Sequence, residues 1–191
     1  MVDLIGEAVR LEAFLQSRGW RFCFIGGLAV QHWGEPRLTR DLDVSLLTGF
    51  GGERAYVESL VSVYSPRIED AIEFALTRRV LLVRSESGVG IDVSLAALPY
   101  EELAVNRAIP VEMLPGSSVR LCSPEDLIVM KMFAGRDTDL RDVRSVIVRQ
   151  SERGLDWRYI ETHLADLAEL KEDPALLARL REIRQAGAAS R

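Results

Sequence analysis

The stretch "FIGGLAVQHWGEPRLTRDLDVSLL", residues 24–47, decides the fold and places two acids inside an otherwise apolar run. The apolar letters "RFCFI" just before the Gly26-Gly27 pair predict a buried strand, and "LAVQHW" after the pair predicts a short helix that Gly34 ends. The segment "DLDVSLL" predicts the next strand. Side chains two apart on a strand share a face, so Asp41 and Asp43 are expected to present their carboxylates side by side.

The composition is that of an ordinary globular protein. The chain has 191 residues, of which 48% are hydrophobic and 28% charged, and its formal net charge is −5. This length suits one domain, or a domain with a helical appendage, and the negative charge disfavours a broad nucleic-acid-binding face. Cys23 and Cys122 both lie in apolar runs, so we expect two buried, reduced thiols. Because neither a signal peptide nor an apolar run of membrane-spanning length is visible, we expect a cytoplasmic protein without membrane contact.

The order of expected elements divides the chain in two. Strand-like and helical patterns mix up to about residue 122, and "VLLVRSESGVGIDVSLAAL" is typical of a hairpin. From "SPEDLIVMKMFAG" onward only helices are expected, the first with Ser123 as N-cap and Pro124 at its first position. We therefore predict an α+β protein: residues 1–122 form a core with a mixed sheet flanked by helices, and residues 123–191 form a helical region packed on that core.

A third acid suggests what the two strand aspartates do. Two like charges this close repel, and a cation between them relieves the repulsion. Hard oxygen ligands suit Mg²⁺ or Mn²⁺, and Asp92 in "GVGIDVSLA" is a third acid in an apolar strand. Three carboxylates on neighbouring strands are able to hold two metal ions for phosphoryl transfer. The alternative is that Asp41 caps a loop while Asp43 and Asp92 simply face water.

Two further features point to phosphate. The Gly26-Gly27 turn precedes a helix, so its backbone N–H groups and the positive end of the helix dipole are able to approach an anion. In "RLTRDLD", Arg37 and Arg40 offer guanidinium groups that bind phosphate oxygens through two hydrogen bonds, and Thr39 adds a hydroxyl. The alternatives are an ordinary tight turn and a pair of surface salt bridges.

Together these features resemble the DNA polymerase beta-like nucleotidyltransferase superfamily, over roughly residues 20–145. The similarity is greater to the branch of AbiEii-type toxins and their small uncharacterised relatives. Two groups of residues carry it: Gly26, Gly27, Ala29, Gly34, Arg37, Thr39, Asp41 and Asp43 in the first motif, and Asp126, Lys131, Arg136, Asp139 and Asp142 in a helical motif. AbiEii-type toxins have a larger C-terminal helical part, so the acceptor here is expected to differ, or a second subunit to complete the site.

The resemblance implies a polymerase beta-like fold and a role for each matching position. Asp41, Asp43 and Asp92 would be the catalytic and metal-holding carboxylates, with Asp92 orienting or deprotonating the acceptor hydroxyl. The implied nucleotide-binding residues are Gly26, Gly27, Arg37, Thr39 and Lys131. For Lys131 the alternative is a solvated lysine on an amphipathic helix. Asp139 and Asp142 are better explained by a structural ion-pair ladder with Arg136.

The sequence thus supports one principal hypothesis and two rivals. The principal hypothesis is a transferase that moves a nucleoside monophosphate from an NTP to a hydroxyl of a tRNA, a protein or a small molecule, with Mg²⁺ or Mn²⁺ as cofactor. By family analogy it would be a toxin with an antitoxin partner. The first rival is an inactive nucleotide- or partner-binding module of the same fold, and the second is an interaction protein whose acids are only solubilising. Sequence patterns leave the acceptor, the preferred base and the oligomeric state open.

Overall fold

A computed structural model describes residues 3–188 and separates the chain into two compact units. The first unit comprises Met1–Leu28 and Leu38–Cys122, and the second comprises Ala29–Arg37 and Ser123–Arg191. The segment 29–37 therefore belongs with the helical residues, although the sequence patterns grouped it with the core. The assignment of separate domains, and the packing of the helical region on the core, stay predictions.

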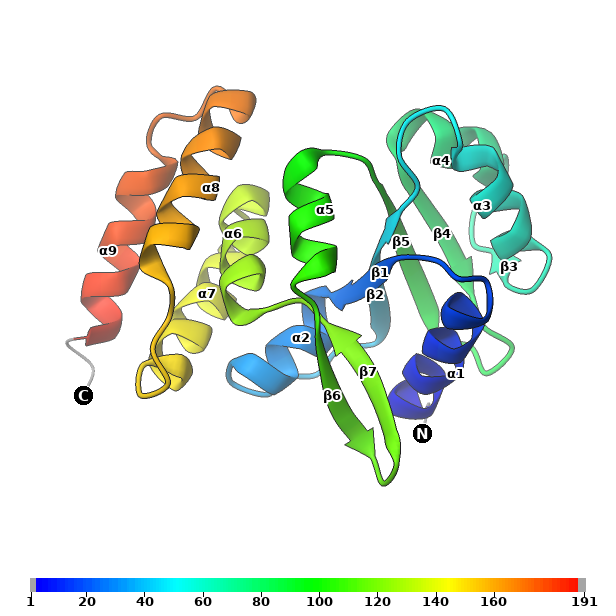
Figure 1. The fold of residues 1–191 in the computed structure, drawn as a ribbon, viewed down its shortest axis with the longest axis horizontal. Coiled ribbons are helices and arrows are strands. Elements are labelled where there is room, and N and C mark those ends of the chain that lie inside the picture. The colour runs from blue at the N-terminus through cyan, green and yellow to red at the C-terminus, as the bar shows by residue number, and fades with distance from the viewer. Residues whose placement is uncertain (1–2, 189–191) are drawn as a thin grey trace. The chain divides into compact units, whose positions relative to one another are not determined.

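The first unit is built on one mixed sheet of seven strands, in the order β3-β4-β5-β2-β1-β7-β6 (Figure 1). The bounds of the strands are β1 Phe22–Ile25, β2 Asp41–Leu47, β3 Ser65–Pro66, β4 Val80–Arg84, β5 Gly90–Ala96, β6 Ile109–Leu114 and β7 Ser117–Leu121. β4 and β5 form the antiparallel pair that the sequence pattern predicted. β2 pairs with β5, and β1 with β7, in parallel, and the local pattern of these strands did not indicate either partner.

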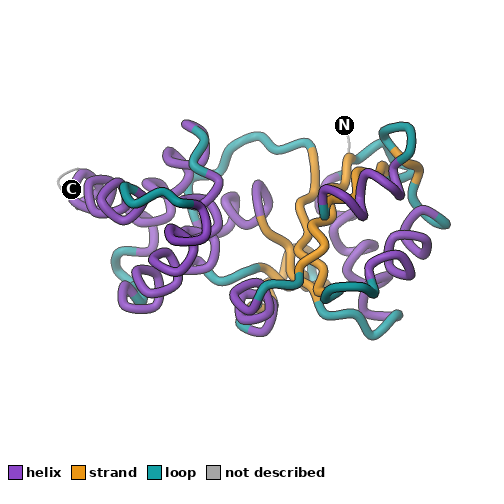
Figure 2. Tube along the Cα trace, turned by 90° about the horizontal axis from the view of Figure 1, so that it is seen from above, coloured by secondary structure: helices purple, strands orange, loops and turns teal. Residues whose placement is uncertain are grey.

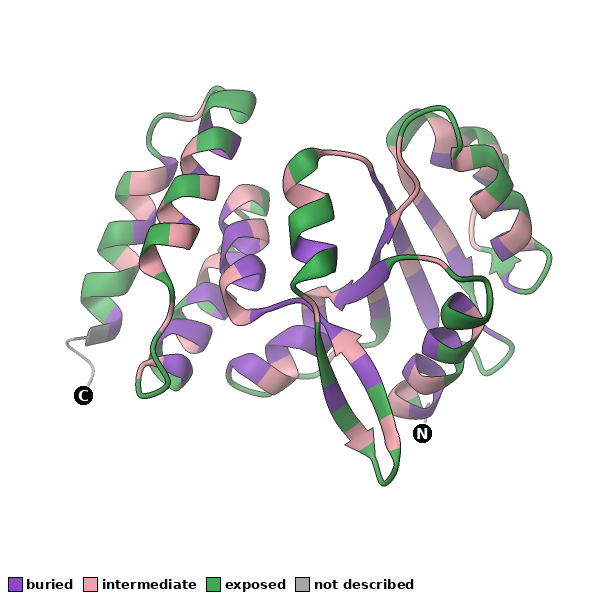
Figure 3. Ribbon diagram, in the orientation of Figure 1, coloured by how far each residue is buried: buried purple, intermediate pink, exposed green. Residues whose placement is uncertain are grey.

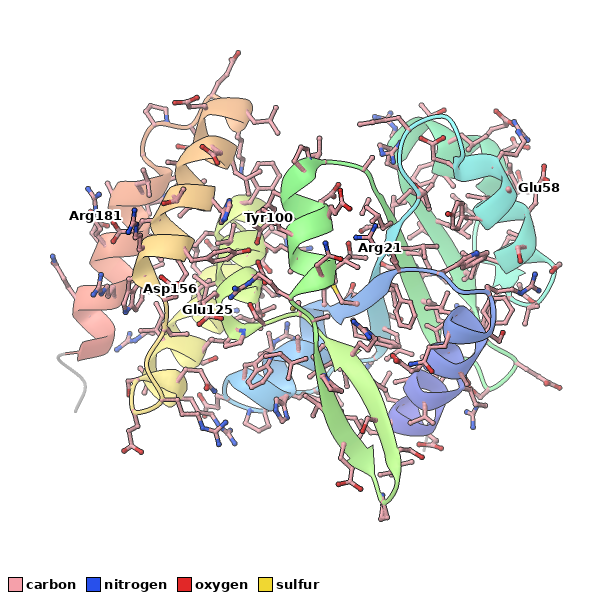
Figure 4. All side chains as sticks on the ribbon, viewed as in Figure 1. Arg21, Glu58, Tyr100, Glu125, Asp156 and Arg181 are labelled. Atoms are coloured by element: carbon pink, nitrogen blue, oxygen red, sulfur yellow. The ribbon has the colours of Figure 1, made fainter. Side chains whose placement is uncertain are left out.

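Among the described residues, the first unit also contains the helices α1 Leu4–Ser17, α3 Glu53–Val61, α4 Ala71–Arg78 and α5 Pro99–Asn106. The sequence patterns did not single out α5. Its signal is Pro99 at the first helical position, with the Glu101 carboxylate accepting hydrogen bonds from the backbone N–H groups of Ala97 and Leu98. Arg21, labelled in Figure 4, ties α5 to the start of β1, because its guanidinium donates to the Glu102 carboxylate at 2.9 Å.

The second unit is helical. Its helices are α6 Pro124–Ala134, α7 Asp137–Gln150, α8 Trp157–Lys171 and α9 Leu176–Ala188, and Figure 2 shows only helix and loop colours over them. Ser123 is the N-cap of α6, as predicted: its hydroxyl accepts from the N–H of Asp126 at 3.1 Å and donates to that carboxylate at 2.6 Å. Glu125 and Asp156, labelled in Figure 4, join the starts of α6 and α8, because the backbone N–H of Asp156 donates to the Glu125 carboxylate at 3.3 Å.

Each unit has a core of its own. The sheet buries strand residues such as Phe24, Val44 and Ile91 completely, and Figure 3 shows the buried colour over much of the central strands, whereas β6 and β7 carry exposed and intermediate colours as well. Cys23 and Cys122 are buried thiols, as expected.

Of the helices within residues 3–188, none combines the length and the apolar composition that crossing a membrane requires.

Candidate active site

The register of β2 against β5 brings the three predicted acids onto one face of the sheet. Asp43 is the partner of Asp92, and Asp41 is the partner of Gly90, in a parallel ladder. Cross-strand partners point to the same face, and so do residues two apart, so the three carboxylates share that face. The side chains of Asp41 and Asp92 are 53% and 35% exposed, so solvent reaches both carboxylates.

Arg67 joins two of these acids, and the sequence patterns did not single it out. Its guanidinium forms a hydrogen-bonded ion pair with Asp92, and its Nη1 lies 3.7 Å from Oδ1 of Asp41. The side chain of Arg67 is only 19% exposed. The local letters "YSPRIED" resemble any turn with a surface arginine, so only the pairing of β3 with the sheet reveals this contact.

The third acid, Asp43, lies against the glycine turn. Its Oδ2 accepts a hydrogen bond of 3.2 Å from the N–H of Gly27, within the helix α2 that runs from Gly26 to Trp33. Gly26 has φ +59°, and a Cβ on it would lie 2.0 Å from Asp43 Oδ2. A Cβ on Gly27 would lie 2.3 Å from the Thr39 hydroxyl oxygen. Both positions therefore require glycine, because Asp43 and Thr39 approach the start of α2 so closely.

This contact differs from what the phosphate prediction expects of the turn. That prediction expects N–H groups pointing freely into a cleft, whereas the Gly27 N–H is bonded to Asp43 and the residue is buried. A phosphate at this N–H requires Asp43 to exchange it for another partner.

The electrostatics of Asp92 match its position between like and opposite charges. Burial is the main influence and raises the pKa of Asp92, and the neighbouring Asp41 raises it further. The guanidinium of Arg67 acts in the opposite direction and lowers it, without cancelling the effect of burial. A carboxylate in this environment ionises at a cost, and additional positive charge beside it would reduce that cost.

A divalent metal suits these residues in chemistry, and the three acids lie on one sheet face. Carboxylate oxygens are the donors that Mg²⁺ and Mn²⁺ prefer, and three of them share one sheet face. In the part of the chain that the structure describes, however, no three His, Cys, Asp or Glu side chains are gathered closely enough to hold a metal as they stand. Asp41 and Asp92 lie against the guanidinium of Arg67, and Asp43 accepts a hydrogen bond from the Gly27 N–H.

The other two predicted nucleotide-binding residues, Arg37 and Lys131, meet around Asp142 in the second unit. Lys131 is buried, and its Nζ lies 2.8 Å from carboxylate oxygens of both Asp139 and Asp142. The interpretation of Lys131 as a solvated lysine is therefore wrong. Arg37 binds Asp142 through two hydrogen bonds of 2.8 and 2.9 Å, and Arg136 binds Asp139 at 2.6 Å.

Buried carboxylates in this cluster remain ionised because cations surround them. Burial tends to raise the pKa of Asp139 and Asp142. The hydrogen bonds and charges of Arg136 and Lys131 at Asp139, and of Arg37 and Lys131 at Asp142, outweigh burial and hold both pKa values below their ordinary range. The cluster joins α6, α7 and the segment after α2 within the second unit.

The architecture matches solved nucleotidyltransferase-like structures. One is an antigenic nucleotidyltransferase-like protein from Paracoccidioides brasiliensis, with TM-score 0.52 and 19% identity over 94% of this chain and 92% of that chain. Another is ANT(2″)-Ia in complex with adenylyl-2″-tobramycin, with TM-score 0.52 and 16% identity over 89% of this chain and 98% of that chain. At these identities the likeness defines the fold, which is that of a nucleotidyltransferase. No curated protein matches the sequence.

The family follows from the sequence itself. The family described as "Nucleotidyltransferase of unknown function (DUF6036)" matches residues 14–175, and the chain belongs to it. This confirms the nucleotidyltransferase part of the resemblance. The narrower resemblance to AbiEii-type toxins stays a prediction.

Proposed function

We propose that this protein is a metal-dependent nucleotidyltransferase that moves a nucleoside monophosphate from an NTP to a hydroxyl group. The observation that carries the proposal is the register pairing of Asp43 with Asp92, with Asp41 on the same sheet face. Strands from separate parts of the chain thus present three acids together, next to a glycine turn at a helix start. Family membership supports the same reaction class.

In this proposal Asp41, Asp43 and Asp92 would hold Mg²⁺ or Mn²⁺. The metal, when bound, would neutralise charge on the triphosphate and on the attacking and leaving oxygens. The acceptor oxygen forms a bond to the α-phosphorus while the bond to the β-phosphate oxygen breaks and pyrophosphate leaves. Asp92 would take the proton of the acceptor hydroxyl, a role that suits a carboxylate whose pKa burial has raised.

The phosphate contacts would come from the glycine turn. Gly26 and Gly27 leave room at the start of α2, and Thr39 lies against Gly27. Binding at the Gly27 N–H would follow once Asp43 turns from that N–H to a metal. For Arg37 and Lys131 the carboxylate contacts favour a structural role, and direct contact with the nucleotide stays a prediction.

The class of molecule that acquires the labelled nucleotide identifies the acceptor. The purified protein is incubated with each α-labelled NTP and Mg²⁺ in the presence of a panel of hydroxyl-bearing small molecules, total RNA or lysate protein. Adenylyl-tobramycin in the ANT(2″)-Ia structure makes a small molecule the first acceptor class to test. We expect label on one class, none after EDTA treatment and a loss of at least ~100-fold for Asp92→Asn. Toxicity on expression in cells, relieved by a neighbouring antitoxin, would assign a toxin role.

A rival function has one specific observation in its favour. Arg67 supplies positive charge between Asp41 and Asp92 without any metal, as expected if the fold had become an inactive binding module. Such a module would bind nucleotide or a partner and leave the label in the NTP under every condition of the same assay.

A further inference from the structure

Arg67 is placed by the sheet itself opposite the acids. Its backbone N–H donates to the carbonyl of Leu82 at 3.0 Å, which continues the pairing of β3 with β4. Leu82 is in turn the partner of Asp92, and Asp92 is the partner of Asp43. The four residues form one row, with Arg67 directly after β3 and the others on β4, β5 and β2, so the Arg67 side chain extends over Leu82 toward the carboxylates.

The space for this arginine is made by a glycine. Gly90 is the ladder partner of Asp41 and is buried. A Cβ at position 90 would lie 2.1 Å from Oδ1 of Asp41 and 2.7 Å from Nη1 of Arg67. Only glycine at this position lets the carboxylate and the guanidinium lie over β5 together.

One N–H group of the guanidinium forms no hydrogen bond with the described residues. Among residues 3–188, the Nε of Arg67 is a buried polar atom without a hydrogen-bond partner, whereas its two Nη atoms face Asp41 and Asp92. A buried N–H that forms no hydrogen bond carries a desolvation cost, so the arrangement gains when an acceptor arrives. Phosphate oxygens are the acceptors that a guanidinium binds best, in pairs.

We propose that Arg67 is the internal counter-ion of the metal-free site: it holds the place of the metal between Asp41 and Asp92 and moves to the triphosphate when metal and nucleotide bind. This inference rests on the proposed function. Arginine stays protonated at every physiological pH, so its charge cannot be removed and must be displaced. A divalent cation cannot share the two carboxylates with it without repulsion between like charges.

If Arg67 is replaced, the proposed competition with the metal and a purely structural salt bridge predict opposite changes in metal affinity. If Arg67 only supported the shape of the site, its removal would loosen the carboxylates and weaken metal binding. If it competes with the metal, its removal leaves the carboxylates without a cation and strengthens metal binding. Metal affinity measured without nucleotide therefore distinguishes the two, independently of activity.

The experiment compares the wild type with Arg67→Gln, Arg67→Lys and Arg78→Gln. Arg78 is an exposed arginine on α4 and serves as the matched control, since its substitution removes the same charge elsewhere on the unit. Mn²⁺ binding is followed by electron paramagnetic resonance in the absence of nucleotide, and melting curves are recorded with and without Mn²⁺. MgATP affinity is measured separately.

For Arg67→Gln we expect Mn²⁺ binding about tenfold tighter than in the wild type, a lower melting temperature without metal that Mn²⁺ restores, and weaker MgATP binding. Arg67→Lys keeps the positive charge but loses the two-pronged guanidinium geometry, so its Mn²⁺ affinity should lie between those of the wild type and Arg67→Gln. Arg78→Gln should match the wild type. Unchanged or weaker Mn²⁺ binding by both Arg67 variants, in a wild type that binds Mn²⁺ and transfers nucleotide, would overturn this inference alone. Absence of Mn²⁺ binding and of transfer in every variant would overturn the proposed function and this inference with it.

Discussion

At the scale of single residues, the candidate site depends on which partner each carboxylate has. Asp43 accepts from Gly27, Asp92 pairs with Arg67, and Asp41 lies near the same guanidinium. All three are therefore compensated by the protein before any ligand binds. Substitutions at these positions should separate stability from activity.

Asp43→Asn is the cleanest such substitution. The asparagine oxygen is still able to accept the Gly27 N–H, so we expect the free energy of unfolding without metal to change by no more than about 0.5 kcal/mol. Relief of repulsion from the neighbouring acids would shift it upward. Transfer activity should nevertheless fall at least ~100-fold, because a lost metal contact raises the barrier by several kcal/mol. A melting curve and a transfer assay with Mg²⁺ check both parts, and equal activity in the two proteins would remove Asp43 from the metal site.

Gly26→Ala tests the close approach at the start of α2. Gly49 provides a matched control, because it has a similar positive φ of +71°, while a Cβ added to it would meet no heavy atom of the described residues within 4 Å. Gly49→Ala should cost about 1 kcal/mol from backbone strain alone. Gly26→Ala should cost clearly more, since the new Cβ meets Asp43, and should also impair nucleotide binding. Urea unfolding compares the two, and equal costs would show that the Asp43 contact adjusts freely.

At the scale of elements, the cluster around Lys131 connects α6 and α7. The Lys131 side chain is 9% exposed and contacts two carboxylates that are 1% and 6% exposed. Breaking a buried ion pair from one side leaves the other charge without compensation. The second unit should therefore be sensitive to this lysine whether or not nucleotide is present.

Lys131→Met should lower the free energy of unfolding by about 3 kcal/mol. Lys171→Met is the control: that exposed lysine on α8 donates to a backbone carbonyl of α6, so its loss should cost about 1 kcal/mol or less. Chemical denaturation measures both variants. If Lys131→Met were as stable as the wild type but bound MgATP poorly, Lys131 would instead belong to the nucleotide site.

The pH dependence of stability follows from the same cluster. The pKa values of Asp139 and Asp142 are lowered in the folded protein, so their contribution is fully present above the unfolded pKa of about 3.9 and is lost as pH falls below it toward the folded values. We expect urea unfolding to show a steep loss of stability below about pH 4. Asp139→Asn should be less stable at pH 7, and its free energy of unfolding should fall less steeply below about pH 4. An unchanged loss of stability below pH 4 would show that other carboxylates control the acid sensitivity.

At the scale of the whole molecule, ligand binding should report on the unit that contains the site. At a MgATP concentration of about 100 times Kd, stabilisation is about 2.7 kcal/mol. For a chain of this size each kcal/mol raises the melting temperature by roughly 2–4 °C. We expect the transition that contains the first unit to move upward by about 5–10 °C, and the shift to shrink for Asp43→Asn. The scan is repeated with each NTP and Mg²⁺, and the absence of a shift with all of them would contradict nucleotide binding.

Local patterns of the sequence were sufficient for most elements and for the three acids. The apolar run "RFCFI" predicted β1, the segment "DLDVSLL" predicted β2, and Ser123 with Pro124 marked the start of α6. These signals lie within the elements that they specify, because caps and hydrophobic periodicity act over a few residues. The glycine pair and the spaced aspartates were visible for the same reason.

The tertiary structure alone decided which distant residues meet. The parallel pairing of β2 with β5 places Asp92 beside Asp43, the pairing of β3 with β4 brings Arg67 to the acids, and helix packing in the second unit buries Lys131 against Asp142. A strand carries its own alternation but not the identity of its neighbour, and a charged residue looks the same in sequence whether it faces solvent or a buried carboxylate. Register and burial are set by the packing of the unit around them, so the partners of these charges follow from the fold and not from local sequence.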